Sequence, residues 1–541
     1  MALTGSDASS SRAVSPRAAS GRWRTLLRPP TRPPSSLAPR EQAAAEPLIA
    51  AFRAAEPGAS AADLTELRRA YTVAERMHRG QLRRSGAPYV THPLAVAMIL
   101  AQLGVDRACL VAALLHDTVE DTPYTLGEVR ADFGDEVALI VDGVTKLDGE
   151  RWSKEQAEAE TFRKMVLAAA ADLRVLVVKL ADRLHNLRTL GFQPPHKRER
   201  IARATLELLV PFAERLGIHA LERDMDDLAF AALDPGAHAA TEHAVRRELA
   251  GAGPVLGPAA ALLRAALAGH RVRAEVRIRP RHLHSVHRSR EGNLRGLRPS
   301  DVTRMLVLVE GPPEDCYIAL GAVHSALHPV AGRVKDHIAM PRFNLYRSLH
   351  TVVIGPEGDF LDVIVRTREM HEVAEHGIVA HARQARRGGT AEAVAERLDL
   401  VWLARLLAWQ SGAPSAEFLE GLRSDLAGGN IACFTPRGMT VSLPRRATAL
   451  DYAYALGPEL GARSIGALIN GRLAPLSAEI RVGNVVEILT DPEAAPSPDW
   501  LGFVRTPQAR VHIQRHLDGP HGGGPSVRNA DQDTGWQSSG P

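Results

Sequence analysis

Four ionisable residues stand close together in the run LLHDTVEDT: His116, Asp117, Glu120 and Asp121. They follow directly on the apolar stretch CLVAALL, which is typical of a buried helix. In one continuous helix, His116 and Glu120 would share a face, and so would Asp117 and Asp121. Burying charge is costly unless the groups are paired or bind a metal. The run therefore predicts a divalent cation and an activated water.

Two other segments supply further ligands for such a site. His92 precedes a proline in YVTHPLAVAMIL, and KLADRLHNLRTL places Asp182 and Asn186 one helical turn apart. Two imidazoles and two carboxylates would then be available, from His92, His116, Asp117 and Asp182. Mixed nitrogen and oxygen ligands suit Mn²⁺, Fe²⁺ or Zn²⁺ rather than Ca²⁺. An HD dipeptide alone is weak support, so the prediction depends on all three segments together.

The chemistry that suits this set is hydrolysis of a phosphate ester or anhydride, because a bound metal lowers the pKa of water and polarises a phosphoryl oxygen. Glu120 and Asp121 would remain to relay a proton and orient the water. Positive charge for substrate phosphates would come from Arg83, Arg84 and Arg183. A solvated basic face is the alternative explanation for these arginines.

Hydrophobic periodicity predicts the elements that position these residues. Helical spacing fills ADLTELRRAYTVAERMHRG and the long segment from EQAEAETF to NLRTL, whereas DVTRMLVLVEG, HTVVIGPEG and FLDVIVRT are strand-like. We predict six parts: a disordered extension (1–60), a helical domain (61–230), a mixed domain (231–390), a helical linker (391–428), a β-rich unit (429–491), and a short segment with a disordered tail (492–541).

Composition limits the class of protein. The 541 residues are 45% apolar and 24% charged, as in soluble globular proteins, and no apolar run reaches the ~20 residues of a membrane helix. The isoelectric point near 9.1 favours anionic ligands, with a mild surface bias as the alternative. Cys109, Cys316 and Cys433 form no disulfide or metal pattern. We therefore expect a cytoplasmic protein without membrane contact.

The HP, HDTVED and ADRLHN segments, in this order, resemble the hydrolase domain of the RelA/SpoT homologue family, which makes and destroys the alarmones ppGpp and pppGpp. The resemblance spans residues 65 to 517. It implies Mn²⁺ ligands at His92, His116, Asp117 and Asp182, and catalytic acids at Glu120 and Asp121. It also implies a nucleotide pocket lined by Arg83, Arg84, Ser85, Asn186 and Thr189. The implied reaction releases the 3′-pyrophosphate and leaves GDP or GTP.

The middle region, from RIRPRHLHSVHRS to EHGIVAHAR, resembles the family's synthetase domain, which moves pyrophosphate from ATP to GDP or GTP. The implied site contains Arg279, Arg281, His282, Asp301, Lys335, Tyr346 and Asp362, with Mg²⁺ held partly by Asp301 if any synthesis remains. Several positions depart from the family pattern: Ile278, His284, His287, Leu306, Asp362 and Ile364. We therefore expect a degenerate synthetase, with a divergent but working one as the alternative.

The stretch from CFTPRG to VEILT resembles a TGS domain, a small β-grasp-like module that senses uncharged tRNA on the ribosome in long family members. Gly457 and Ala462 stand where histidines are expected, so we predict at most weak tRNA or ribosome contact. A regulatory module without RNA contact is the alternative.

The expected architecture is an all-α HD-type hydrolase domain, an α+β nucleotidyltransferase-like synthetase domain and a small β-grasp-like TGS domain. The expected function is a metal-dependent guanosine-3′,5′-bis(diphosphate) 3′-pyrophosphohydrolase. Three alternatives remain: a bifunctional enzyme that is also a GTP pyrophosphokinase, a non-catalytic sensor of alarmone or tRNA, and a hydrolase of another nucleotide. The sequence leaves open the metal, the oligomeric state and the role of the basic N-terminus.

Overall fold

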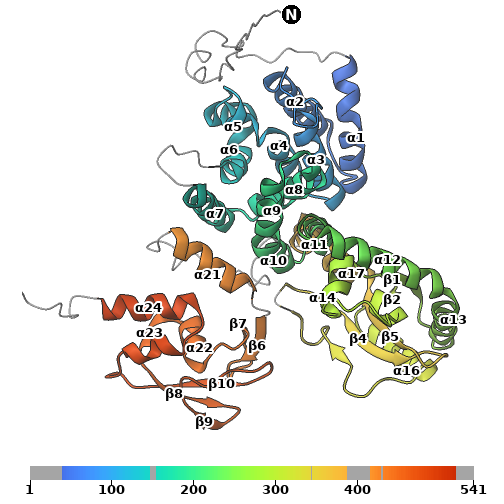
Figure 1. Ribbon diagram of the computed structural model, residues 1–541, viewed down its shortest axis with the longest axis vertical. Helices are drawn as coiled ribbons and strands as arrows, with labels where there is room; N and C mark the ends of the chain where they lie inside the picture. Colours follow the sequence, from blue (N-terminus) through green and yellow to red (C-terminus); the bar gives the residue numbers. More distant parts are fainter. Residues whose placement is uncertain (1–38, 147–153, 343, 387–414, 428–429, 519–541) are drawn as a thin grey trace, which may run out of the picture.

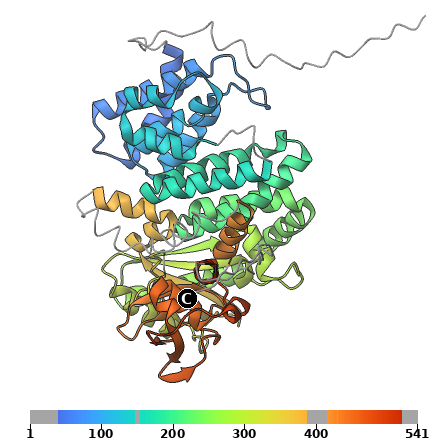
Figure 2. The same ribbon diagram turned by 90° about the vertical axis from the view of Figure 1, so that its left-hand side faces the viewer.

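Three units make up the structure, a computed structural model that describes residues 39–146, 154–342, 344–386, 415–427 and 430–518 (Figure 1). A helical unit comes first, an α/β unit second and a small β-rich unit last, which confirms the expected fold classes. Figure 2 shows the helical unit above the other two. The disorder expected for 1–38 and 519–541, and the helical linker expected at 391–414, lie outside the described residues.

The helical unit contains the following elements: α1 (Pro39–Ala55), α2 (Ala61–Met77), α3 (Thr91–Leu103), α4 (Arg107–Leu115), α5 (Thr118–Asp121), α6 (Leu126–Val144), α7 (Lys154–Ala171), α8 (Arg174–Arg188), the 3-10 turn η1 (Leu190–Phe192), α9 (Pro195–Ala204), the π-helical turn η2 (Thr205–Leu209), α10 (Val210–Arg215) and α11 (His219–Leu233). The long helical segments predicted from periodicity are α2, α7 and α8. Ser60 caps α2 through a capping box with Asp63.

Helix α1 corrects one prediction, because residues 39–55 were expected to be disordered. Leu48, Ile49 and Phe52 are buried, and α1 packs on α3. The segment EPLIAAF carries these apolar residues on one face, which supplies the burial that offsets the entropy cost of ordering. The helix was not predicted, because the residues before it are rich in Ser, Arg and Pro and suggested that the whole N-terminal segment is disordered.

A second correction concerns the run LLHDTVEDT, which does not form one continuous helix. Helix α4 ends at Leu115, and α5 begins only at Thr118, with His116 and Asp117 in the turn between them. Both turn residues keep right-handed φ and ψ angles, but the regular helical ladder is interrupted. His116 and Glu120 therefore do not lie in one continuous helix, although the Asp121 amide still donates to the Asp117 carbonyl at 3.0 Å.

The α/β unit contains the following elements: α12 (Pro235–Gly251), α13 (Gly253–Gly269), β1 (Ala274–Pro280), α14 (Leu283–Ser289), α15 (Pro299–Val302), β2 (Thr303–Val309), α16 (Asp315–Ala326), β3 (Lys335–Asp336), β4 (Leu349–Ile354), β5 (Phe360–Thr367), α17 (Arg368–His376) and α18 (Ile378–Arg386). The sheet order is β1-β2-β5-β4-β3, with only β2 and β5 parallel. Helices α13 and α16 pack on the sheet and share its apolar core. The three predicted strands are β2, β4 and β5.

Later segments return to complete the core of the helical unit. Ile378 and Val379 on α18 belong to this core, and so do Phe418, Leu422 and Leu426 on α21 (Ser415–Ala427). Arg423 on α21 also pairs with Glu207 at 3.0 Å. The helical core is therefore not contiguous in sequence, and residues after 376 fill part of it.

The turns at Gly217 and Gly377 pass close to each other where the helical and α/β units meet. The Ile378 amide donates to the Leu216 carbonyl at 3.0 Å, and Asn344 Nδ2 donates to the Glu214 carbonyl at 3.0 Å. Gly377 has φ of +51°, and a Cβ there would overlap the Leu216 carbonyl oxygen and lie 2.8 Å from Gly217 Cα. Only glycine at this crossing lets the two backbones approach so closely.

The β-rich unit contains β6 (Asn430–Phe434), β7 (Thr440–Pro444), α22 (Ala449–Leu456), α23 (Pro458–Ala462), β8 (Ser464–Ile469), β9 (Arg472–Ala474), β10 (Val486–Thr490), η3 (Pro498–Gly502) and α24 (Pro507–Leu517). The buried Asp451 carboxylate accepts bonds from Thr448 and from the Arg505 and Thr506 amides, so it ties α24 to α22. Within the described residues no single helix could cross a membrane, although the bent pair α12 and α13 together passes by length and composition.

Candidate functional site

Four buried side chains converge between α3, α8 and the turn after α4. His92 Nε2 lies 3.4 Å from Asp117 Oδ2 and 3.2 Å from Asp182 Oδ1. His116 Nε2 lies 3.2 Å from Asp117 Oδ1 and 3.9 Å from Asp182 Oδ1. The structure thus brings together the three separate sequence segments. His92, His116 and Asp117 have the spacing of a possible metal site.

The orientation of the His116 imidazole fits a bound cation. His116 Nδ1 donates to the Ala113 carbonyl at 2.8 Å, which leaves Nε2 free to be a ligand. That buried Nε2 has no hydrogen-bond partner among the described residues. A buried nitrogen facing two carboxylates without a hydrogen bond is costly unless it binds a ligand. The donor set therefore fits a divalent cation.

The electrostatics keep both carboxylates ionised. Burial would raise the pKa of Asp182, but the Lys179 ammonium at 3.2 Å and the hydrogen bond to His92 outweigh it, so the pKa lies well below the usual value. Burial likewise opposes ionisation of Asp117, and the His116 and His92 rings overcome it and lower the pKa. Asn186 Nδ2 also donates to Asp182 Oδ1 at 2.6 Å.

The two proposed catalytic acids have different surroundings. Glu120 accepts from the Lys146 amide at 2.5 Å and pairs with Lys146 Nζ at 2.8 Å. Asp121 is exposed, and the Tyr89 hydroxyl lies 2.7 Å from its Oδ2 and 3.0 Å from Asp117 Oδ2. Burial and the two carboxylates raise the pKa of Tyr89, so its proton stays in place. Tyr89 therefore links Asp121 to the metal-site carboxylate.

The predicted nucleotide-binding residues differ in their surroundings: some are hydrogen-bonded beside the cluster and others are exposed. Arg83 donates to Asn186 Oδ1 at 3.1 Å and lies 3.2 Å from His185 Nδ1, so the loop before α3 is held against α8. Arg84 and Ser85 are exposed in that loop, and the Thr189 hydroxyl bonds carbonyls of its own helix. Arg183 differs from the prediction, because its guanidinium contacts Ile201 and Thr205 rather than the cluster.

Sequence reasoning missed four residues around the site: Tyr89, Lys179 and His185 contact the cluster, and Lys146 contacts Glu120 beside it. His185 Nδ1 lies 2.7 Å from His92 Nδ1, and burial first, then His92, lowers its pKa to about 4. His185 lies one turn from Asp182 and Lys179 lies one turn before it, so helical spacing could have indicated both. Lys146 gave no comparable indication, because it approaches Glu120 from the end of α6.

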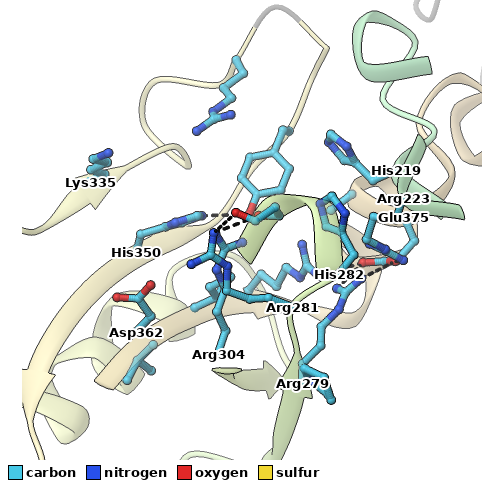
Figure 3. A pocket seen from close by; sticks show the side chains of 18 of the residues that line it. His219, Arg223, Arg279, Arg281, His282, Arg304, Lys335, His350, Asp362 and Glu375 are labelled. Carbon is cyan, nitrogen blue, oxygen red and sulfur yellow. Dashed lines mark hydrogen bonds and ion pairs between the residues drawn. The ribbon is translucent and has the colours of Figure 1, made fainter. Parts of the chain in front are cut away.

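A second site is a cavity of about 470 Å³ at the junction of the helical and α/β units (Figure 3). Six of the seven predicted synthetase-like residues line it: Arg279, Arg281, His282, Lys335, Tyr346 and Asp362. Asp301 is not on the cavity wall. Its carboxylate instead accepts from the Arg298 amide at 2.9 Å and caps the short helix α15.

Glu375 gathers three arginines at one end of this cavity. Arg279 binds it with two hydrogen bonds of 2.6 and 2.9 Å, Arg223 pairs at 2.7 Å and Arg366 at 3.2 Å. Burial would raise the pKa of Glu375, but these guanidinium groups hold it far below its usual value. Arg223 comes from α11, so the helical unit supplies part of the cavity wall.

Three residues that depart from the family pattern, Leu306, Ile364 and His284, pack against neighbouring side chains. Leu306 on β2 lies opposite Ile364 on β5, and the two buried side chains form a small apolar cluster with Leu308. His284 stacks on Phe230 with ring centroids 4.7 Å apart and pairs with Asp226 at 2.7 Å. Apolar packing therefore occupies two positions where the family resemblance implies polar groups.

Comparison with known proteins identifies three domains along the chain. Residues 70–219 match the HD domain, residues 279–388 match the region found in RelA / SpoT proteins, and residues 431–490 match the TGS domain. The first contains the cluster around His116, and the second contains the residues of the cavity from Arg279 to Glu375. These matches agree with the family and domain types predicted from sequence.

Curated relatives match most of the chain. The GTP pyrophosphokinase of Streptomyces coelicolor is 45% identical over 487 residues, which cover 87% of this chain and 57% of that protein. The bifunctional (p)ppGpp synthase/hydrolase RelA of Mycobacterium tuberculosis is 47% identical and covered to 64%. The corresponding SpoT of Escherichia coli is 40% identical and covered to 65%. The chain thus spans about six-tenths of the length of these relatives.

Proposed function

This chain belongs to the RelA/SpoT homologue family, and we propose that its N-terminal site is a metal-dependent guanosine-3′,5′-bis(diphosphate) 3′-pyrophosphohydrolase. The observation that carries the proposal is the convergence of His92, His116, Asp117 and Asp182 beside two further carboxylates. When bound, a divalent cation supplies an activated water and polarises a phosphoryl oxygen. Mn²⁺ suits this donor set, as do Fe²⁺ and Zn²⁺.

The protein groups would divide the remaining work. Water attacks the phosphorus next to the ribose 3′ oxygen, that P–O bond breaks, pyrophosphate leaves and the 3′ oxygen takes a proton. We assign proton transfer and water orientation to Glu120 and Asp121. Tyr89 positions Asp121 through its hydroxyl. Arg83 and Arg84 would bind the substrate phosphates.

The test uses the full chain with ppGpp and Mn²⁺, and it measures GDP and pyrophosphate release. Asp117→Asn should abolish product formation, because the cation loses a ligand while the side-chain shape is kept. The matched control is Asp135→Asn, since Asp135 is exposed on α6 and pairs with Arg130 on the surface. Unchanged hydrolysis in Asp117→Asn would refute the assignment.

A bifunctional enzyme is the second candidate, and the relatives favour it, because they include a GTP pyrophosphokinase and a bifunctional (p)ppGpp synthase/hydrolase. We prefer a hydrolase with a degenerate synthetase, given the apolar Leu306–Ile364 pair and the position of Asp301. Incubation with ATP, GDP and Mg²⁺ separates the two. Synthesis at a rate comparable to hydrolysis would establish the bifunctional enzyme.

For the C-terminal unit we propose at most a weak contact with tRNA or the ribosome. The TGS match at residues 431–490 supports this class of partner, whereas Gly457 and Ala462 lack the side chains expected of a strong contact. Titration with uncharged tRNA in low and moderate salt measures the affinity. Tight binding that persists in moderate salt would contradict the proposal.

A further inference from the structure

His78 is a buried histidine beside the N-terminal site, and the proposed reaction does not use it. It ends α2 as the C-cap residue and is only 2% exposed. We infer that His78 is a positioning residue of this site, which fixes Asp121 through Gln81 and Tyr89. Within the described part of the chain it makes no hydrogen bond or ion pair with the four proposed metal ligands. The inference deepens the proposed hydrolase function and rests on it.

The first connection runs from His78 to the backbone of α5. His78 Nδ1 lies 2.8 Å from the side-chain oxygen of Gln81, and Gln81 Nε2 donates to the Asp121 carbonyl at 3.1 Å. The amide oxygen can only accept, so His78 Nδ1 carries the proton. Asp121 is the last residue of α5, and carbonyls at a helix end lack partners within the helix. Gln81 supplies that partner, and His78 fixes the orientation of the Gln81 amide.

The second connection runs from His78 to the side chain of Asp121. The His78 ring stacks on the Tyr89 ring, with centroids 4.5 Å apart and an angle of 20° between the planes. The Tyr89 hydroxyl in turn donates to Asp121 Oδ2 at 2.7 Å. Among the residues that the structure describes, the exposed Asp121 carboxylate has no other hydrogen-bond partner. The stacking therefore places the donor that orients this carboxylate.

Both connections start in one short loop. The Gln81 amide donates to the His78 carbonyl at 2.9 Å, and the Tyr89 amide donates to the Gln81 carbonyl at 3.0 Å. Two contacts on one residue, at the carbonyl and at the carboxylate of Asp121, fix its side chain relative to its backbone. That precision matters for a group that handles a proton, because proton transfer requires hydrogen-bond distance.

The chemistry of His78 favours this role over packing alone. A phenylalanine would also stack on Tyr89, but it could not donate to Gln81. The histidine leaves its Nε2 atom buried without a hydrogen-bond partner among the described residues, which is costly. Burial lowers the pKa of His78, so the ring is neutral at neutral pH. The observed contacts thus use the donor that distinguishes histidine from phenylalanine.

The test measures initial rates of ppGpp hydrolysis by the full chain with Mn²⁺. His78→Phe keeps the stacking on Tyr89 and removes the donor to Gln81, whereas Gln81→Leu removes the link itself. Each change should lower kcat by about 10-fold and leave KM and the Mn²⁺ affinity within about threefold, because the proposed metal ligands keep their places. The double variant should be no slower than the slower single variant, since both changes break one connection.

His270→Phe and Gln102→Leu are the matched controls. His270 is the C-cap of α13 in nearly the same backbone conformation as His78, but it is exposed and lies in the other unit. Gln102 is exposed on α3. Both controls should hydrolyse ppGpp at the rate of the unmodified protein. Unfolding midpoints exclude loss of the fold, and Mn²⁺ titration followed by electron paramagnetic resonance measures the metal affinity.

Three results would overturn the inference: an unchanged kcat in His78→Phe, a parallel loss of kcat and Mn²⁺ affinity, or effects of the two substitutions that multiply in the double variant. Any of these leaves the proposed hydrolase intact if the unmodified protein releases pyrophosphate and Asp117→Asn does not. If the unmodified protein releases no pyrophosphate from ppGpp, the proposed function fails and this inference fails with it. The unmodified protein and Asp117→Asn therefore distinguish the two failures.

Discussion

The cluster around His116 and the cavity around Glu375 are built on opposite principles. In the first, four ligand groups are buried, face one another, and are held by hydrogen bonds from residues such as Asn186 and Tyr89. In the second, charged side chains line a wide space, and several of the cations form no ion pair with a described residue. The difference teaches that buried charges are tolerated where they face opposite charges or ligand atoms at fixed distances, whereas a solvent-accessible cavity tolerates cations without carboxylate partners.

The largest expected effect concerns the metal ligands. Replacing His116 by Ala, or adding chelator to the unmodified protein, should lower ppGpp hydrolysis by about 10³-fold or more, because water loses its activation. Arg247→Ala should change the rate little, since that residue lies in the other unit. Initial rates of pyrophosphate release provide the measurement. Full activity in chelator would show that hydrolysis at the cluster around His116 does not depend on a bound metal.

The glycine crossing between the two units should have the next largest effect. Gly377→Ala forces a side chain into backbone atoms of Leu216 and Gly217, so we expect a loss of about 2–4 kcal/mol in the free energy of unfolding. Gly191→Ala is the control, because nothing lies within 4 Å of its added Cβ. Denaturant titration compares them, and equal stabilities would show that the crossing tolerates movement.

Tyr89 should have a smaller effect, because it positions other groups. Tyr89→Phe removes the hydroxyl shared by Asp117 and Asp121, and we expect about a 10-fold loss in activity or metal affinity. The pH profile of kcat should also change, since Asp121 loses its donor. Thr65→Val on α2 is a control for the loss of a hydroxyl on a surface. A pH profile identical to that of the unmodified protein would mean that Tyr89 has only a packing role and does not position Asp121.

The smallest expected effect concerns a histidine in the cavity. Burial, followed by His337 and then nearby arginines, lowers the pKa of His350 to about 3, and neutral His350 accepts a bond from Tyr346 at 2.8 Å. The unfolded chain has a pKa near 6.5, so it binds the proton first as the pH falls. Stability is therefore present above about pH 6.5 and is lost progressively toward pH 3.

The matching measurement is the free energy of unfolding at pH 7 and pH 5.5. The unmodified chain should lose about 1 kcal/mol more than His350→Gln over this interval, since one pKa unit corresponds to about 1.4 kcal/mol. Glutamine keeps an acceptor for Tyr346 and does not titrate. An equal loss in both proteins would assign the pH dependence to other groups.

The sequence identified the four side chains that converge in the cluster, but it did not identify most of the residues that hold them in place. His92, His116, Asp117 and Asp182 could be found because their residue types are costly to bury and recur in ordered segments. Tyr89 and Lys146 could not, since each is an ordinary residue until the fold brings it beside a carboxylate. The helix break at His116 was also missed, because the run has neither glycine nor proline to indicate it.

Periodicity predicted the helical, mixed and β-rich regions, and the strands β2, β4 and β5 were predicted where they occur, whereas the named fold types came from the family resemblance. The sequence did not predict that α1, α18 and α21 pack in the core of the helical unit, because an amphipathic helix does not specify which core it joins. Likewise, Leu306 and Ile364 were seen as separate departures, and only strand register shows that they face each other.

The discontinuous core of the helical unit has a consequence for how the protein is made. Its last members, Leu422 and Leu426 on α21, leave the ribosome roughly 200 residues after α11. At about 5–20 residues per second, this delay is about 10–40 s, during which the part of the apolar core that α21 covers is not yet buried in the nascent chain. The proposed metal ligands are therefore synthesised early, but the core of the unit that carries them is completed late, and a chaperone would be needed during that interval.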